Sequence, residues 1–264
     1  MAKLDPSKIY FTPSKITKEE RSIAAKKYRT ASKLKNKRTV AIIICGVLAV
    51  AAIPAIVMLF HKYRFDTTFT ASGVPDYSSK YESSINEDPI QIDVKGEEHG
   101  VLNGIGATLK YIAYYDITGV VASVHDYFGF GFFDTYVPRD VCLAWGDLKD
   151  SLTDPDISYR QSDRKCYLSF QNFEVEDVSK YYYGAFRNKY SDFNMSNNHL
   201  IPATKEVRNQ IISLRRGETI RLVGYLVRMH SDNPGDPVYV SSTRRDDGGN
   251  GACEIMFVTK LEKK

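Results

Sequence analysis

The sequence predicts one transmembrane helix followed by a β-rich (α+β) extracytoplasmic domain, either a small OB-like barrel or a strongly curved sheet with one helix. Three observations support this fold class. Residues 39–60 carry no charged side chain. Residues 116–261 contain several β-branched and aromatic runs, many of them bounded by glycine, proline or polar turns. Within that part, residues 202–217 show the clearest helical spacing and end signals.

Residues 1–38 form a basic arm, with 12 Lys and Arg against 3 Asp and Glu. From Thr17 onward the arm is rich in helix-forming residues, and Thr17 with Glu20 matches a capping box. Its apolar stripe is thin, so we interpret it as a cytoplasmic juxtamembrane helix that contacts anionic lipid headgroups. The charge is not interleaved with aromatic residues, and nucleic acid is therefore not an expected partner.

Residues 39–60 are expected to form the transmembrane helix. At ~1.5 Å per residue the run reaches about 33 Å, enough to cross a hydrocarbon core of ~30 Å. The basic arm outweighs Lys62 and Arg64 beyond the span, which predicts a cytoplasmic N-terminus and an extracytoplasmic C-terminal part. The long basic region and the lack of a small-residue cleavage site favour an uncleaved signal anchor.

The part beyond the span divides into a linker and a domain. Residues 61–100 are rich in Ser, Asp, Glu and Gly, and we interpret them as a stalk before a folded domain at 101–264. Residues 61–264 hold 24 of the 36 basic and 29 of the 32 acidic residues, a balance that also argues against nucleic acid binding. Small residues spaced four apart in the span, such as Ala41 and Cys45, permit a homo-oligomer.

The domain is expected to place strands on both sides of one helix. Strand-like runs lie at 116–124, 140–145 and 165–171 before the helix, and at 218–229, 237–242 and 252–261 after it. A helix between the third and fourth strands is typical of an OB-like barrel, and a mixed α+β sheet is the alternative. Gly224 indicates a bend in the long fourth run, and the aromatic run 128–136 is interpreted as a strand edge or a loop over the core.

Three cysteines lie in the predicted domain. Two of Cys142, Cys166 and Cys253 can form one disulfide, and three buried thiols are the alternative. Cys253 and His199 could also act as a thiol nucleophile and its base. Because the alternation of the last strand directs Cys253 toward the core with Ile255, we interpret it as a buried structural thiol instead.

The candidate binding residues are mostly polar side chains near the C-terminus. Asp246, Asp247, Asn250 and Glu254 could surround a hard cation, but their spacing misses the EF-hand pattern, and a glycine-rich turn explains the run without a metal. No histidine pair has zinc-ligand spacing, so neither a metal nor a cofactor is expected. The full candidate set is Trp145, Asn198, His199, Arg244, Arg245, Asp246, Asp247 and Glu254.

Three segments near the C-terminus carry a resemblance. They are NNHLIPA, which begins at Asn197, then RRGETIRLVGYLV and SSTRRDDGGNGACE. Together they resemble a recurring pattern in uncharacterised bacterial single-pass envelope proteins. The resemblance implies a bacterial inner membrane and a periplasmic domain, and it supplies no functional residues.

These observations predict a single-pass envelope protein whose outer domain binds a protein partner in an assembly or scaffold role. The sequence contains no G-x-S-x-G motif or P-loop, which favours a role other than catalysis. The alternative is a membrane-anchored hydrolase or small-ligand-binding barrel with a site near His199, Arg244, Asp246 and Glu254. The expected partners are the lipid bilayer and an envelope protein.

Overall fold

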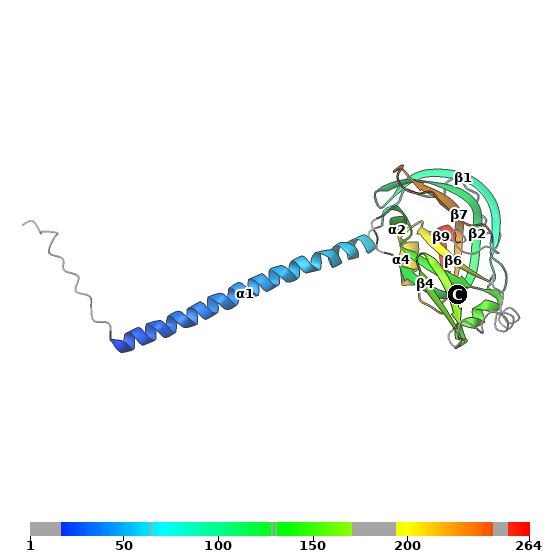
Figure 1. The fold of residues 1–264 in the computed structure, drawn as a ribbon. Coiled ribbons are helices and arrows are strands. Elements are labelled where there is room, and N and C mark those ends of the chain that lie inside the picture. The colour runs from blue at the N-terminus through cyan, green and yellow to red at the C-terminus, as the bar shows by residue number, and fades with distance from the viewer. Residues whose placement is uncertain (1–16, 64, 128, 130, 171–193, 245–252) are drawn as a thin grey trace, which may run out of the picture. The chain divides into compact units, whose positions relative to one another are not determined.

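The computed structural model describes residues 17–63, 65–127, 129, 131–170, 194–244 and 253–264. It contains two compact units, Met1–Leu59 and Phe60–Lys264. Figure 1 shows a long helix near the N-terminus and a strand-rich domain in the rest of the chain.

The helix that begins in the first unit is α1 (Lys18–Tyr63), which is 46 residues long. Its N-terminal half is rich in Lys and Arg, and its C-terminal half contains the apolar run.

The structure contradicts the prediction of a transmembrane helix at 39–60. Within the described parts of the chain, no helix is both long enough and apolar enough to cross a bilayer. The fold class of a transmembrane helix plus an extracytoplasmic domain, the signal anchor and the single-pass location in an inner membrane all depended on that span. They are therefore contradicted together.

The second unit is β-rich with few helices, as the sequence predicts. Its strands are β1 (Ile90–Leu102), β2 (Ile105–Asp126), β3 (Arg139–Ala144), β4 (Ile157–Ser162), β5 (Lys165–Phe170), β6 (Met195–Pro202), β7 (Thr219–Ser231), β8 (Tyr239–Val240) and β9 (Glu254–Lys263). Its helices are α2 (Phe132–Tyr136), the 3-10 helix η2 (Gly146–Thr153) and α4 (Lys205–Ser213).

Five of these strands close into a ring. β2 pairs with β3, β3 with β6, β6 with β9, β9 with β7, and β7 again with β2. The β6–β9 pairing is parallel and the other four are antiparallel. In chain order the five ring strands are β2, β3, β6, β7 and β9. Because α4 connects β6 to β7, it follows the third of these strands and precedes the fourth, as in an OB-type barrel.

Gly224 marks a close approach between β7 and β9. The strand register shifts between Val223 and Gly224, which is the signature of a bulge. A Cβ atom on Gly224 would lie 2.0 Å from the carbonyl oxygen of Phe257 on β9. Only a residue without a side chain fits there, so the glycine lets two adjacent barrel strands pack tightly where β7 bends.

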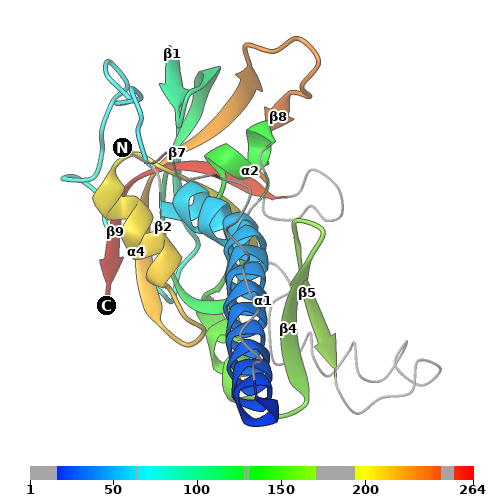
Figure 2. The same ribbon diagram turned by 90° about the vertical axis from the view of Figure 1, so that its left-hand side faces the viewer.

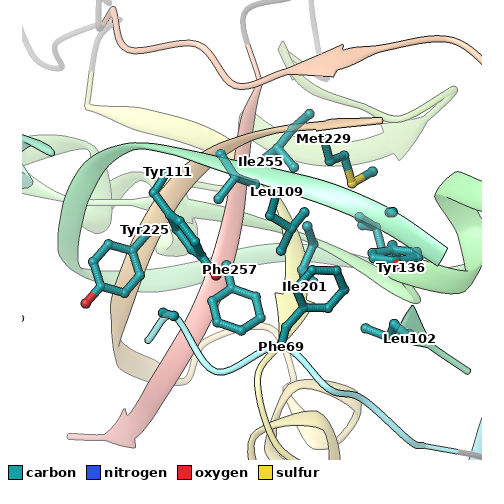
Figure 3. Close-up of a cluster of buried hydrophobic side chains, with 14 of the residues drawn as sticks. Phe69, Leu102, Leu109, Tyr111, Tyr136, Ile201, Tyr225, Met229, Ile255 and Phe257 are labelled. Carbon is teal, nitrogen blue, oxygen red and sulfur yellow. The ribbon is translucent and has the colours of Figure 1, made fainter. Parts of the chain in front are cut away.

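Buried apolar side chains form two large clusters in the second unit. One contains Tyr115 and Trp145 together with Val207 and Ile211 of α4, so the helix closes this part of the core. Figure 2 shows α4 beside β9, at one side of the strands. The other cluster is rich in aromatic rings, and Figure 3 shows Phe69, Tyr111, Tyr225 and Phe257 within it.

The segment between α1 and β1 packs on the barrel through a buried ion pair. Arg221 on β7 is 4% exposed and donates to both carboxylate oxygens of Asp116 on β2, at 2.9 and 2.7 Å. It also donates to the carbonyl oxygen of Tyr81 at 3.0 Å, and the Ser83 hydroxyl donates to Asp116 at 2.7 Å. These bonds connect part of the range interpreted as a linker to the folded domain.

Strands β4 and β5 form a separate two-stranded sheet. A disulfide between Cys142 on β3 and Cys166 on β5 attaches it to the barrel. Its two-residue turn is Asp163-Arg164, and both residues have positive φ, at 52° and 61°. An arginine rarely adopts this left-handed conformation, because its Cβ crowds the backbone there.

The aromatic run 128–136 differs from the predicted strand edge or loop. Residues 128 and 130 lie outside the described residues, and Phe132–Tyr136 form the short helix α2. Phe132 and Tyr136 are four residues apart and both are buried, so one turn of helix places both rings against the core.

Candidate functional site

A pocket of about 500 Å³ lies where α2, the β4–β5 turn, β6, β8 and the start of β9 meet. This volume falls within the range of pockets that hold small molecules, roughly 300–1,000 Å³. Its aromatic lining residues are Phe133 and Tyr239, and His199 and Cys253 also line it. Residues far apart in the sequence therefore meet at a single concave surface.

His199 is held in the pocket by a carboxylate from the next strand. It lies on β6 opposite Asp140 of β3, so both side chains point to the same side of the sheet. The Nδ1 atom of His199 lies 2.8 Å from Oδ1 of Asp140. Both residues are buried, at 5% and 0% exposure, and this contact fixes the orientation of the imidazole ring.

The pKa of His199 reflects a competition between burial and its neighbours. Burial alone would lower it, because an apolar surrounding disfavours the charged imidazolium. Hydrogen bonds between the ring and Asp140 and Cys253, together with the charges of these two groups, outweigh burial and raise the pKa of His199 to about 9. At neutral pH the ring is therefore a cation between the Asp140 carboxylate and the Cys253 sulfur.

Cys253 is a free, half-buried cysteine just before β9. The side-chain amide of Asn197 donates to its sulfur at 3.5 Å, and the thiol donates to the carbonyl oxygen of Arg164 at 3.6 Å. Asn197 is fixed by two further bonds, one to the Arg164 carbonyl at 2.9 Å and one from Gln161 at 2.8 Å. The sulfur thus has defined neighbours and lines the pocket, in contrast to the buried thiol expected from the sequence.

Arg164, in the turn between β4 and β5, also contacts Asp140 and lines the pocket. Its guanidinium donates to Asp140 at 2.7 Å, to the Val137 carbonyl at 3.1 Å and to Asp134 in a short contact. It also stacks over the ring of Tyr127, 3.3 Å from the centroid. These bonds offset the strain of a positive φ, a combination that is common where a structure holds a functional group in place.

The apolar side of the pocket is formed by aromatic rings. The centroids of Phe133 and Tyr239 lie 4.2 Å apart, and those of Phe133 and His199 lie 5.3 Å apart in an edge-on arrangement. Burial raises the pKa of the Tyr239 hydroxyl, which keeps it neutral at physiological pH. The two rings pack against each other with their planes 35° apart, and they form an aromatic wall next to the cationic imidazole.

Charges of both signs lie at the pocket. Among the described residues, Arg164, Lys165 and the protonated His199 line it together with Asp134 and Asp163. Asp140 lies buried behind His199, and with this carboxylate the described charges balance. Such a lining suits an uncharged ligand with acceptor atoms better than an anion.

Of the described candidate binding residues, His199 alone lines the pocket. Trp145 is buried in the core and donates to Asp88 at 3.1 Å. Asn198 is buried and donates to the carbonyl oxygens of Val141 and Ser196. Glu254 is buried, and Arg244 is exposed at the end of the segment that follows β8. Arg245, Asp246 and Asp247, with Asn250, lie outside the described residues.

The described residues include no group of three or more His, Cys, Asp or Glu that could hold a metal ion. Sequence reasoning missed Asp140 and Arg164, which hold the imidazole and the turn. An available signal was the polar dipeptide Asp163-Arg164 between two strand-like runs, which is hairpin-turn spacing.

Comparisons of the chain with family models, with curated proteins and with solved structures find no match.

Proposed function

We propose that the second unit is a small-ligand-binding barrel whose pocket binds an uncharged aromatic compound with a carbonyl group. The observation that carries this proposal is the meeting of the Phe133–Tyr239 rings with the His199 cation in one pocket. The rings provide apolar contact area for a flat group. The protonated imidazole, held by Asp140, provides a directed donor for a carbonyl oxygen.

The charge balance supports an uncharged ligand. Arg164 is already bonded to Asp134 and Asp140, so it does not offer an unpaired positive charge to an anion. An anion would have to be desolvated next to these carboxylates, which costs free energy and offsets its attraction to Lys165 and the His199 cation. A cation would meet the imidazolium at close range.

The test uses three probes that share a ring and differ in charge: benzamide, benzoate and benzylamine. We expect benzamide to bind most tightly in ligand-observed NMR and to raise the unfolding temperature of the full chain, because a ligand that binds only the folded state stabilises it. Phe133→Ala and Tyr239→Ala should each weaken benzamide binding. Tyr167→Ala, on an exposed ring outside the pocket lining, is the matched control and should not.

Failure of benzamide to bind, or equal weakening by Tyr167→Ala, would contradict the proposal. Tighter binding of benzoate would show that the pocket selects an anion and would overturn the charge argument. The other expectation, a protein partner in an assembly role, is not tested by these contacts and stays a prediction.

A further inference from the structure

The pocket also contains the parts of a nucleophilic site. Cys253 and His199 both line this pocket, and Asp140 contacts His199 from the neighbouring strand. The His199 Nδ1 atom is engaged by Asp140 at 2.8 Å, which leaves Nε2 as the ring nitrogen for the thiol. In this arrangement a carboxylate orients an imidazole, and the imidazole lies beside a thiol. It is the arrangement that activates a cysteine to attack an electrophilic carbon.

We propose that Cys253 is a nucleophile that takes the acyl group of a small aryl ester bound in this pocket, with His199 as its acid–base partner. The inference rests on the proposed ligand pocket, because the ester must bind between the aromatic rings and the sulfur. Cys253 and His199 are the catalytic residues, and Asp140 is a positioning residue that acts through His199.

The chemical step balances without any oxidant or cofactor. The attacking form is a thiolate–imidazolium pair, in which the proton of the Cys253 thiol resides on Nε2 of His199. The thiolate sulfur attacks the ester carbonyl carbon, a carbon–sulfur bond forms and the bond from that carbon to the leaving oxygen breaks. The proton on His199 Nε2 passes to the leaving oxygen, so the products are a thioester on Cys253 and a free phenol or alcohol. Water then attacks the thioester while neutral His199 accepts its proton, and the thiolate leaves.

Asn197 fixes the position of the sulfur. Its Nδ2 atom donates to Sγ of Cys253 at 3.5 Å. The amide is itself held by Gln161 and by the Arg164 carbonyl, so the sulfur has a defined donor beside it before the ester binds.

A purely structural thiol is the competing explanation, and the surroundings of the sulfur argue against it. A structural cysteine packs as a small apolar group in the core. Cys253 instead is half-buried, lines a pocket and contacts an imidazole and a side-chain amide. Thiols in polar, partly exposed surroundings beside a cationic histidine are the reactive ones.

The test treats the full chain with 4-nitrophenyl acetate and follows both nitrophenolate release and acetylation of each thiol by peptide mass spectrometry. Cys45 on α1 is the internal control, because it is free and exposed but has no described histidine partner. We expect Cys253 to be acetylated much faster than Cys45. Cys253→Ser should abolish the rapid release, whereas Cys45→Ser should leave it unchanged.

His199→Gln should slow acetylation of Cys253 by at least about 100-fold, the usual contribution of a positioned acid–base group. Asp140→Asn should shift the pH dependence of Cys253 alkylation by iodoacetamide, a result that a merely structural role would not give. Acetylation of Cys253 no faster than that of Cys45 would overturn the inference. Cys253→Ser keeps nearly the same shape, so its binding of benzamide separates a failed nucleophile from a failed ligand pocket.

Discussion

At the scale of single residues, the protonation of His199 couples the candidate site to the stability of the fold. The pKa of His199 is raised from 6.5 to about 9 in the folded state. A raised pKa means that the folded state binds the proton more tightly than the unfolded state. The resulting stabilisation is complete below about pH 6.5 and is lost as the pH rises through about 9.

We expect His199→Gln to remove this proton-linked stability. The difference in unfolding free energy between the natural chain and the variant should be largest below about pH 6.5, where the shift corresponds to up to about 3 kcal/mol. It should shrink as the pH approaches and passes about 9. Urea unfolding at a series of pH values measures it, with His230→Gln on the exposed face of β7 as the control. A difference that grows with pH would contradict the assigned protonation.

The residues of the site show what sequence alone could supply. The residue types of Cys253 and His199 allow a thiol and its base, but the sequence alternation favours a buried structural thiol instead. Asp140 was not recognised as their partner, since its position opposite His199 depends on the register of β3 against β6. The direction of Cys253 was also missed. Alternation predicts a side-chain direction only within a strand, and Cys253 lies just before β9 begins.

At the scale of elements, Gly224 shows how one missing side chain allows two barrel strands to approach. A Cβ atom added there would meet a backbone oxygen, which cannot rotate away as a flexible side chain could. The strands must therefore separate to admit even a methyl group. Because β7 and β9 are adjacent in the ring, such a separation disturbs the closure of the barrel.

We expect Gly224→Ala to destabilise the domain by several kcal/mol, in the range of overpacked or strained substitutions. Gly235→Ala is the matched control, because a Cβ atom there meets its nearest neighbour at an ordinary 3.6 Å. Thermal and urea unfolding of both variants measures the difference. Equal stability of the two variants would show that the β7–β9 contact relaxes at little cost.

Local sequence patterns predicted several elements correctly. They failed where tertiary contacts determine which secondary structure a segment adopts or which strand it pairs with. The helix near 202–217 and the long bent strand at 218–229 correspond to α4 and β7, because both have clear periodicity and end signals. The aromatic run at 128–136 was misread, since its helical turn depends on burial of Phe132 and Tyr136. The run at 165–171 is a strand, but its assignment to a small separate sheet depends on pairing with β4.

At the scale of the whole molecule, the chain divides into Met1–Leu59 and Phe60–Lys264. The described members of the buried apolar clusters all come from the second unit, and so do the residues that line the pocket. The sequence placed a boundary near residue 60 from its change in hydropathy. It placed the start of the domain near 101, but Phe69 is buried and Tyr81 contacts Arg221, so the domain includes earlier residues.

We expect the fragment Phe60–Lys264 to fold by itself and to keep the properties of the site. Its unfolding free energy and its affinity for benzamide should match those of the full chain, because the core clusters and the pocket lie within it. A second fragment that begins at residue 101 should be much less stable. It lacks Phe69 and the Tyr81 and Ser83 partners of the buried Arg221–Asp116 pair, and a buried charge that loses its hydrogen bonds is costly. Urea unfolding of the two fragments beside the full chain measures both effects, and equal stability of the fragments would place the start of the domain at residue 101 instead.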